Sequence, residues 1–95
     1  MLKGKDRSKL KSLAHDLKPV VNIGKDGLDE NVFKSIAEVL KSRELIKIKI
    51  LSNNYDDQEE IIKEILDETN SEFISHFGSI ITIYKRKKEN SKYNI

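Results

Sequence analysis

The sequence predicts an α/β domain of two layers with the element order α-β-α-β-α-β-β. Three observations support this fold class: apolar residues recur at helical spacing in three segments, short β-branched runs follow each of those segments, and the last two runs are joined around Gly78-Ser79. A chain of 95 residues is the size of one domain. We place this domain at residues 1–88 and treat residues 89–95 as a polar C-terminal tail.

The first helix and the first strand are separated by a proline. Leu10, Leu13, Ala14 and Leu17 share one face of a helix, and Pro19 forces the chain out of helical geometry just before it. The β-branched run after the proline predicts a short strand that ends before a glycine.

The second helix is expected to begin at Asp29, because an aspartate is a suitable N-cap and an apolar stripe follows it. That stripe consists of Val32, Phe33, Ile36, Ala37, Val39 and Leu40. In the next strand Ile46, Ile48 and Ile50 alternate with lysines, which predicts a strand with one buried face.

A third helix and a hairpin complete the expected fold. Asp56 is the expected N-cap of the helix, with Glu59 three residues later, and Asn70 is a suitable C-terminal stop. The strands at about 72–77 and 80–84 should form an antiparallel hairpin, whereas right-handed crossovers should make the earlier strands parallel. One face of the sheet should then carry most of the core.

Positive charge is concentrated towards both ends of the sequence. Residues 1–49 hold 12 Lys and Arg against 7 Asp and Glu, residues 50–84 hold one Lys against 8 acidic residues, and residues 85–95 hold 5 basic residues against one Glu. Such a chain can fold with two electrically distinct sides, and a basic side favours polyanions such as nucleic acid. A lysine-rich surface also serves solubility alone, so composition leaves both interpretations open.

Residue types that support catalysis, metal binding or membrane insertion are missing or scattered. Cysteine is absent, His15 and His76 lack metal-ligand spacing, and no apolar run is long enough for a membrane span or a signal peptide. We therefore expect no catalytic residue, no metal or other cofactor, no small-molecule substrate and no membrane partner, and we expect a cytoplasmic location.

The segment Gly24-Lys25-Asp26-Gly27 lies between a predicted strand and a predicted helix. Its glycines allow a ligand to approach the backbone closely, and the following helix should offer unpaired N–H groups to a phosphate, as in the GXXG loop of KH domains. The alternative is a tight turn that needs glycine for geometry alone. Asp26 and Asp29 would repel a phosphate unless they point aside.

Other basic residues are candidates for the same phosphate chemistry. Lys47 and Lys49 share one strand face at roughly 6.6 Å along the strand, which suits the phosphates of an extended nucleic acid. The alternation alone favours the alternative, a solvated strand face whose lysines also discourage aggregation. Basic residues also surround the first helix and follow the last strand, where solvation is again the alternative; they are Lys5, Arg7, Lys9, Lys11, Lys85 and Arg86.

Two further expectations concern the aromatic residues and the acidic helix. The phenylalanines are expected in the core, and Tyr84 is expected to pack there with a solvated hydroxyl. The acidic helix at 56–69 is expected to be a solvated face that points away from any nucleic acid. The rival function for the chain is a protein-interaction module that docks through this helix.

Three separated stretches resemble one family. Residues 15–28 read HDLKPVVNIGKDGL, residues 44–49 read ELIKIK, and residues 78–86 read GSIITIYKR. Together they are similar to the CRM domain, specifically to the short bacterial YhbY-like RNA-binding proteins, and the resemblance covers about residues 2 to 88.

This resemblance implies a fold and a function. The fold would be similar to the C-terminal domain of translation initiation factor three, with a mixed four-stranded sheet. The activity would be non-catalytic RNA binding, which in bacterial relatives is associated with rRNA in precursors of the large ribosomal subunit and in plant relatives with intron splicing. The family's GxxG loop falls on residues 24–27, and its basic surface would draw on Lys18, Lys47, Lys49 and the basic first helix.

The sequence departs from the family pattern at two places. Gly78-Ser79 stands where the family often has Gly-Lys, and Lys85 followed by Arg86 stands where it usually has an arginine directly after the tyrosine. Lysine lacks the planar fork of arginine, which weakens the case for a bidentate phosphate contact at position 85. The expected protein is a monomer that docks on ribosomal RNA in assembly through electrostatic contacts.

Overall fold

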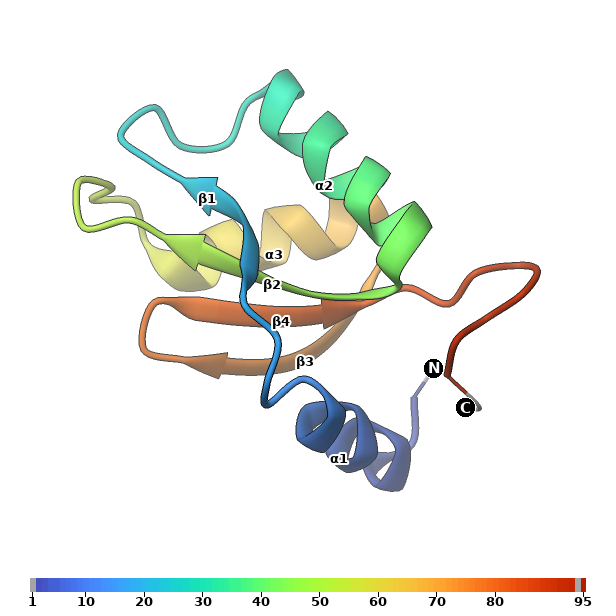
Figure 1. The fold of residues 1–95 in the computed structure, drawn as a ribbon. Helices are drawn as coiled ribbons and strands as arrows, with labels where there is room; N and C mark the ends of the chain where they lie inside the picture. The colour runs from blue at the N-terminus through green and yellow to red at the C-terminus, as the bar shows by residue number, and fades with distance from the viewer. Residues whose placement is uncertain (1, 94) are drawn as a thin grey trace.

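The computed structural model describes residues 2–93 and 95 and has the predicted order of helices and strands (Figure 1). The elements are α1 (Gly4–Leu13), β1 (Pro19–Ile23), α2 (Glu30–Arg43), β2 (Leu45–Ile50), α3 (Gln58–Thr69), β3 (Glu72–Phe77) and β4 (Ile80–Tyr84). Each predicted element is present, so the fold class is confirmed.

The four strands form one mixed sheet in the order β1-β2-β4-β3. β1 pairs with β2 in parallel, with Ile23 opposite Ile50, whereas β4 pairs antiparallel with both β2 and β3. The parallel first pair and the antiparallel hairpin are therefore confirmed. Because β4 begins opposite the end of β2, with Ile80 paired to Lys49, the hairpin turn lies at the end of the sheet where β1 and β2 finish.

The main core lies between α2, α3 and one face of the sheet. Ile46, Ile48 and Ile50 of β2 are at most 2% exposed and pack with Ile36 and Ile65 of the two helices. This is the arrangement that the alternation of isoleucine and lysine in β2 predicts, because successive side chains of a strand point to opposite faces.

A smaller core covers part of the opposite face, where α1 packs (Figure 1). Leu10 and Ala14 of this helix are buried with Leu45, Ile74 and Tyr84. α1 therefore adds a partial layer that the two-layer description did not include. It covers only the end of the sheet where β2 begins, which leaves the other end of that face open.

Three apolar or aromatic side chains differ from expectation. Leu13 is 48% exposed because α1 ends there, and Phe77 is 85% exposed at the end of β3 rather than in the core. The ring of Tyr84 is buried as predicted, but its hydroxyl is buried as well and has no hydrogen-bond partner in the described residues. Burial raises the pKa of this hydroxyl above its usual value.

The helix ends follow the capping rules. The Asp29 carboxylate accepts a hydrogen bond from Val32 N at 2.9 Å, which confirms this cap. α3 is capped by Asp57 and not by Asp56, because the Asp57 side chain accepts from Glu59 N at 3.0 Å while Asp56 is held in the preceding turn. Asn70 closes α3 in the left-handed conformation, with φ of 54°.

A buried carboxylate joins the C-terminal residues to the domain. Glu44 follows α2 with φ of 66° and is 0% exposed. One carboxylate oxygen accepts from Lys87 N at 3.0 Å and Ser91 Oγ at 2.6 Å, and the other accepts from Lys92 N at 2.6 Å. Tyr93 and Ile95 then pack against the smaller core.

The environment of Glu44 favours its charged form. Burial alone raises the pKa of this carboxyl, but the hydrogen bonds from the Lys87 backbone, the Ser91 hydroxyl and the Lys92 backbone outweigh burial and place the pKa below its ordinary value. Because the pKa is lower in the folded than in the unfolded protein, this stabilisation is present at neutral pH. It is lost as the pH falls through the folded-state pKa.

We expect Glu44→Gln to lower the free energy of unfolding by about 1–3 kcal/mol at neutral pH, because the amide NH2 would face a hydrogen-bond donor. The difference from the parent protein should shrink in acid, where Glu44 is itself protonated. Urea denaturation at several pH values measures both effects. Glu38→Gln, on the exposed face of the same helix, is the matched control, and equal stability of the two variants would contradict this role for Glu44.

Candidate nucleic-acid interface

Residues 24–27, which we call the glycine loop, form a tight turn between β1 and α2. Gly27 N donates to Gly24 O at 3.0 Å, and the side chains of Lys25 and Asp26 are exposed at the tip. The loop after β2 braces this turn, because Asn54 Nδ2 donates to Gly24 O at 2.8 Å and to Asp56 Oδ2 at 3.2 Å. The tip is therefore held in a fixed position at the end of the sheet.

The two glycines of the loop differ in what they contribute. Gly27 has φ of +68°, and a Cβ atom there would lie 2.7 Å from Asp56 Oδ2. Gly24 has no such constraint, because its Cβ would make only ordinary contacts at 3.7 Å with Asn53 and Leu51. The turn thus needs glycine at position 27, whereas neither the backbone conformation nor the available space requires glycine at position 24.

The carboxylates of the third helix lie closer to the glycine loop than the sequence suggested. A pocket of about 430 Å³, which we call the acidic pocket, separates the loop from the start of α3. Its lining residues are Asp26, Gly27, Leu28, Asp56, Asp57, Glu60, Ile61 and Glu64.

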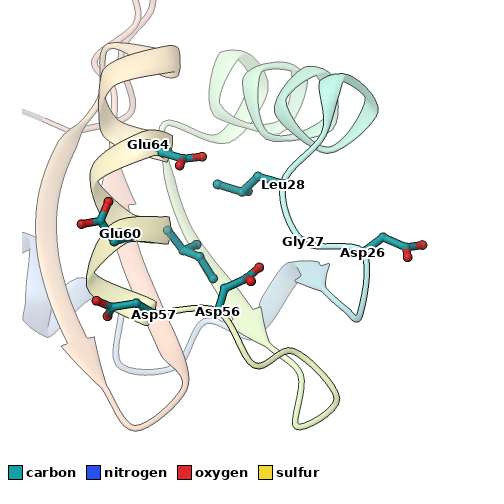
Figure 2. Close-up of a pocket in the computed structure, with 8 residues that line it drawn as sticks. Asp26, Gly27, Leu28, Asp56, Asp57, Glu60 and Glu64 are labelled. Atoms are coloured by element: carbon teal, nitrogen blue, oxygen red, sulfur yellow. The ribbon is translucent and has the colours of Figure 1, made fainter.

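Figure 2 shows Asp56 and Glu64 extending towards the loop, while the Asp26 carboxylate points away from the pocket. Acidic side chains of α3 and of the residues just before it therefore lie beside the candidate phosphate loop, while the expectation that this helix points away from nucleic acid stays a prediction. The cause is the topology: parallel β1 and β2 end side by side, so the loops that follow them come together.

The N-terminus of α2 is also less open than expected. The Asp29 carboxylate accepts the Val32 N–H and places a negative charge at this helix end. The cap therefore occupies one of the N–H groups that this helix was expected to offer to a phosphate. Attraction for a phosphate at the loop must come from Lys25 and from the neighbouring sheet face.

Lys47 and Lys49 lie on the sheet face opposite to α2 and α3, as their alternation predicts. Lys47 is half-buried, and its Nζ donates to His15 O at 3.3 Å. The side chain of Lys49 is exposed and makes no hydrogen bond to the described residues. It pairs with Asn22 of β1, two residues before the glycine loop, so Lys49 and the loop belong to one end of the sheet.

The cations near the N-terminus lie on the same side of the sheet. α1 packs on the face that carries Lys47 and Lys49, and its Lys5, Lys9 and Lys11 are exposed. Arg7 is half-buried and donates from Nε to Phe73 O at 3.0 Å, which fastens α1 to β3. Lys18 is exposed just before β1.

The basic residues after β4 lie at the other end of the sheet. Tyr84 pairs with Leu45 at the start of β2, whereas the glycine loop follows the partner of Ile50 at its end. Lys85 Nζ donates to Thr69 O at 2.9 Å. A groove of about 630 Å³ is lined by Ala37, Leu40, Lys41, Lys85, Arg86, Lys87, Lys88 and Glu89. The structure therefore does not join Lys85 and Arg86 to the glycine loop.

At the end of the sheet that carries the glycine loop, Phe77 is exposed, which the sequence did not predict. Phe77 pairs with Ile80, and Ile80 pairs with Lys49, so one row of side chains crosses the open half of the sheet. We call this row, Asn22, Lys49, Ile80 and Phe77, the open row. The sequence feature that could have indicated this exposure is the position of Phe77 beside the hairpin glycine, at the end of an edge strand.

The described residues offer little for other chemistries. No group of three or more His, Cys, Asp or Glu side chains within residues 2–93 and 95 could hold a metal ion. His76 hydrogen-bonds to Gln58 Oε1 at 2.8 Å, and His15 is exposed. None of the helices described is long and apolar enough to cross a membrane.

Three features characterise this chain as a small α/β protein of one class. They are the element order, the glycine loop after the first strand and the open sheet face that bears lysines. The model of the CRS1/YhbY (CRM) domain matches residues 2–85. The chain therefore belongs to the CRS1/YhbY family, as the three stretches predict.

Several relatives cover nearly the whole chain. A protein of Bacillus subtilis named "Probable RNA-binding protein YqeI" is 37% identical over 95 residues, which are 100% of this chain and 99% of the relative. An RNA-binding protein of Haemophilus influenzae is 36% identical over 88 residues, 93% and 89% of the two chains. The solution structure of a hypothetical Staphylococcus aureus protein, described as a candidate RNA binder, has a TM-score of 0.84 and 43% identity and covers 100% and 99%.

We expect Gly27→Ala to lower the free energy of unfolding by about 1–2 kcal/mol, because an L-residue is strained at positive φ. Gly24→Ala should leave the stability within about 0.5 kcal/mol of the parent. Thermal and urea denaturation of the two variants measure the difference. Equal stability of both variants would show that the conformation of the turn does not depend on Gly27.

Proposed function

We propose that this protein is a non-catalytic RNA-binding protein that acts in the cytoplasm as a monomer and binds rRNA in precursors of the large ribosomal subunit. The observation that carries the proposal is the open end of the sheet, where Lys25 is exposed at the tip of the glycine loop and Lys49 is exposed on the neighbouring strand β2. The names of the relatives support RNA as the ligand.

The charge distribution favours one direction of approach for RNA. The acidic pocket lies on the side of the glycine loop that faces α3, and α3 packs on the sheet face opposite to Lys47 and Lys49. A polyanion is repelled from the first side and attracted to the second. RNA is therefore proposed to run along the α1 side of the sheet, past Lys18 and Lys49, and to reach the glycine loop at Lys25.

The proposed contacts divide into two roles. Gly24 and Gly27, with Lys25 and Asp26 between them, would fix the register of the RNA backbone, and lysines would supply affinity. The lysines on this side are Lys5, Lys9, Lys11, Lys18, Lys47 and Lys49. Arg7 would contribute through the N–H groups that its bond to Phe73 leaves available. Lys85 and Arg86 would form a separate outer contact.

We expect the double variant Lys25→Ala, Lys49→Ala to bind RNA more weakly and to flatten the slope of log K against log salt by about 1.4–1.8, the share of two phosphate contacts. Fluorescence anisotropy with a labelled rRNA fragment at several salt concentrations measures this slope. Lys63→Ala, an exposed lysine of the acidic α3, is the matched control and should leave the slope unchanged. A parent slope near zero would contradict electrostatic docking.

The ribosomal part of the proposal has its own test. Crosslinking in cells followed by sequencing of the attached RNA should recover mainly large-subunit rRNA, and sedimentation should place the protein with large-subunit precursors at low salt. High salt should release it, because the contacts are electrostatic. Mainly non-ribosomal RNA in the crosslinked fraction would refute the ribosomal role. A protein partner that is retained at high salt would favour a protein-interaction module.

A further inference from the structure

We propose that Phe77 is a stacking site for an unpaired base of the RNA, placed next to Lys49, which holds the phosphate. This inference rests on the proposed RNA binding and adds a contact that reads single-stranded rather than duplex RNA.

The exposure of Phe77 requires an explanation. Its side chain is 85% exposed, although phenylalanine is among the residue types most often buried and burial of such a ring is favourable. The ring lies on the sheet face that α1 leaves uncovered at this end, because Phe77 pairs with Ile80 and Ile80 pairs with Lys49. No described segment covers it.

The neighbours of Phe77 favour a nucleotide over an apolar partner. Lys49 is exposed two strands away in the open row, so the Cα atoms of the two residues lie about 10 Å apart at the usual strand spacing. One nucleotide can span this distance with its base on the ring and its phosphate at the ammonium group. Half-buried Ile80 lies between them and provides an apolar floor for the sugar and the base.

The path of the chain leads from this row to the glycine loop. Asn22 completes the row beside Lys49 and is exposed, and Gly24 follows two residues later. The hairpin turn, the loop after β2 and the glycine loop all lie at the same end of the molecule (Figure 1). An RNA strand can therefore contact Phe77, Lys49 and Lys25 in succession.

A second exposed aromatic residue at this end lies in the opposite electrostatic setting. Tyr55 is 93% exposed in the loop after β2, but Asp56 and Asp57 follow it directly and line the acidic pocket. Carboxylates disfavour the phosphate that accompanies a stacked base. Of the two exposed rings, the structure therefore assigns the stacking role to Phe77, and Tyr55 is the natural control.

The test measures binding of a short unstructured RNA and of the same RNA with abasic sites, so that the number of phosphates stays constant. Phe77→Ala should weaken binding of the intact RNA about five- to a hundredfold, the usual effect of removing one stacking ring. It should leave the salt slope unchanged, because no charge is removed. Binding of the abasic RNA should be the same for the parent and the variant.

Two further variants separate stacking from general apolar contact. Phe77→Leu keeps an apolar side chain without the ring and should lose most of the affinity that Phe77→Ala loses. Phe77→Trp should bind at least as well as the parent, and its tryptophan is the only one in the chain, so intact RNA should quench its fluorescence and abasic RNA should not. Tyr55→Ala should bind like the parent.

The outcomes distinguish this inference from the function on which it rests. If the parent protein binds neither RNA, the proposed function fails and the inference fails with it. If the parent binds with the expected salt slope and Phe77→Ala binds equally well, RNA binding stands and the stacking site is refuted. A loss in Tyr55→Ala without a loss in Phe77→Ala would also refute it.

Discussion

The alternation of isoleucine and lysine along β2 is the constraint on which the rest of the molecule depends. Ile46, Ile48 and Ile50 hold the sheet against α2 and α3, and the same backbone presents Lys47 and Lys49 to the other side. Because β2 is hydrogen-bonded to a strand on each side, its apolar face lies within the core face of the sheet and its lysine face lies within the opposite, more polar face. The apolar face builds the stability of the domain, and the polar face remains available for a ligand.

The glycine loop lies on the boundary between these two environments. Asn54 fixes the turn against the loop after β2, and Asp56 and Glu64 approach it from the helical side. These carboxylates disfavour a polyanion on the side of the glycine loop that faces α3, and they leave the side that faces Lys49 accessible. A ligand that reached the loop from the helical side would meet negative charge, so repulsion would contribute to the proposed preference for the sheet side.

The sequence predicted the elements well because each rests on local rules, such as the stripe of α2, the alternation of β2 and the hairpin at Gly78. The errors concern relations between distant segments. The proximity of Asp56 to the glycine loop follows from strand order, which periodicity does not reveal. The exposure of Phe77 follows from the extent to which α1 covers the second face, and α1 leaves the end of β3 uncovered.

The attachment of the C-terminal residues through Glu44 has a consequence for how this segment can change over evolution. The carboxylate accepts hydrogen bonds from the main-chain N–H groups at positions 87 and 92, and every amino acid except proline has such a group. These two hydrogen bonds do not depend on the side chains at positions 87 and 92, and the charge of Lys87 adds to the stabilisation of the ionised carboxylate. Any substitution other than proline at positions 87 and 92 thus keeps these two main-chain hydrogen bonds, provided that Glu44 and Ser91 persist.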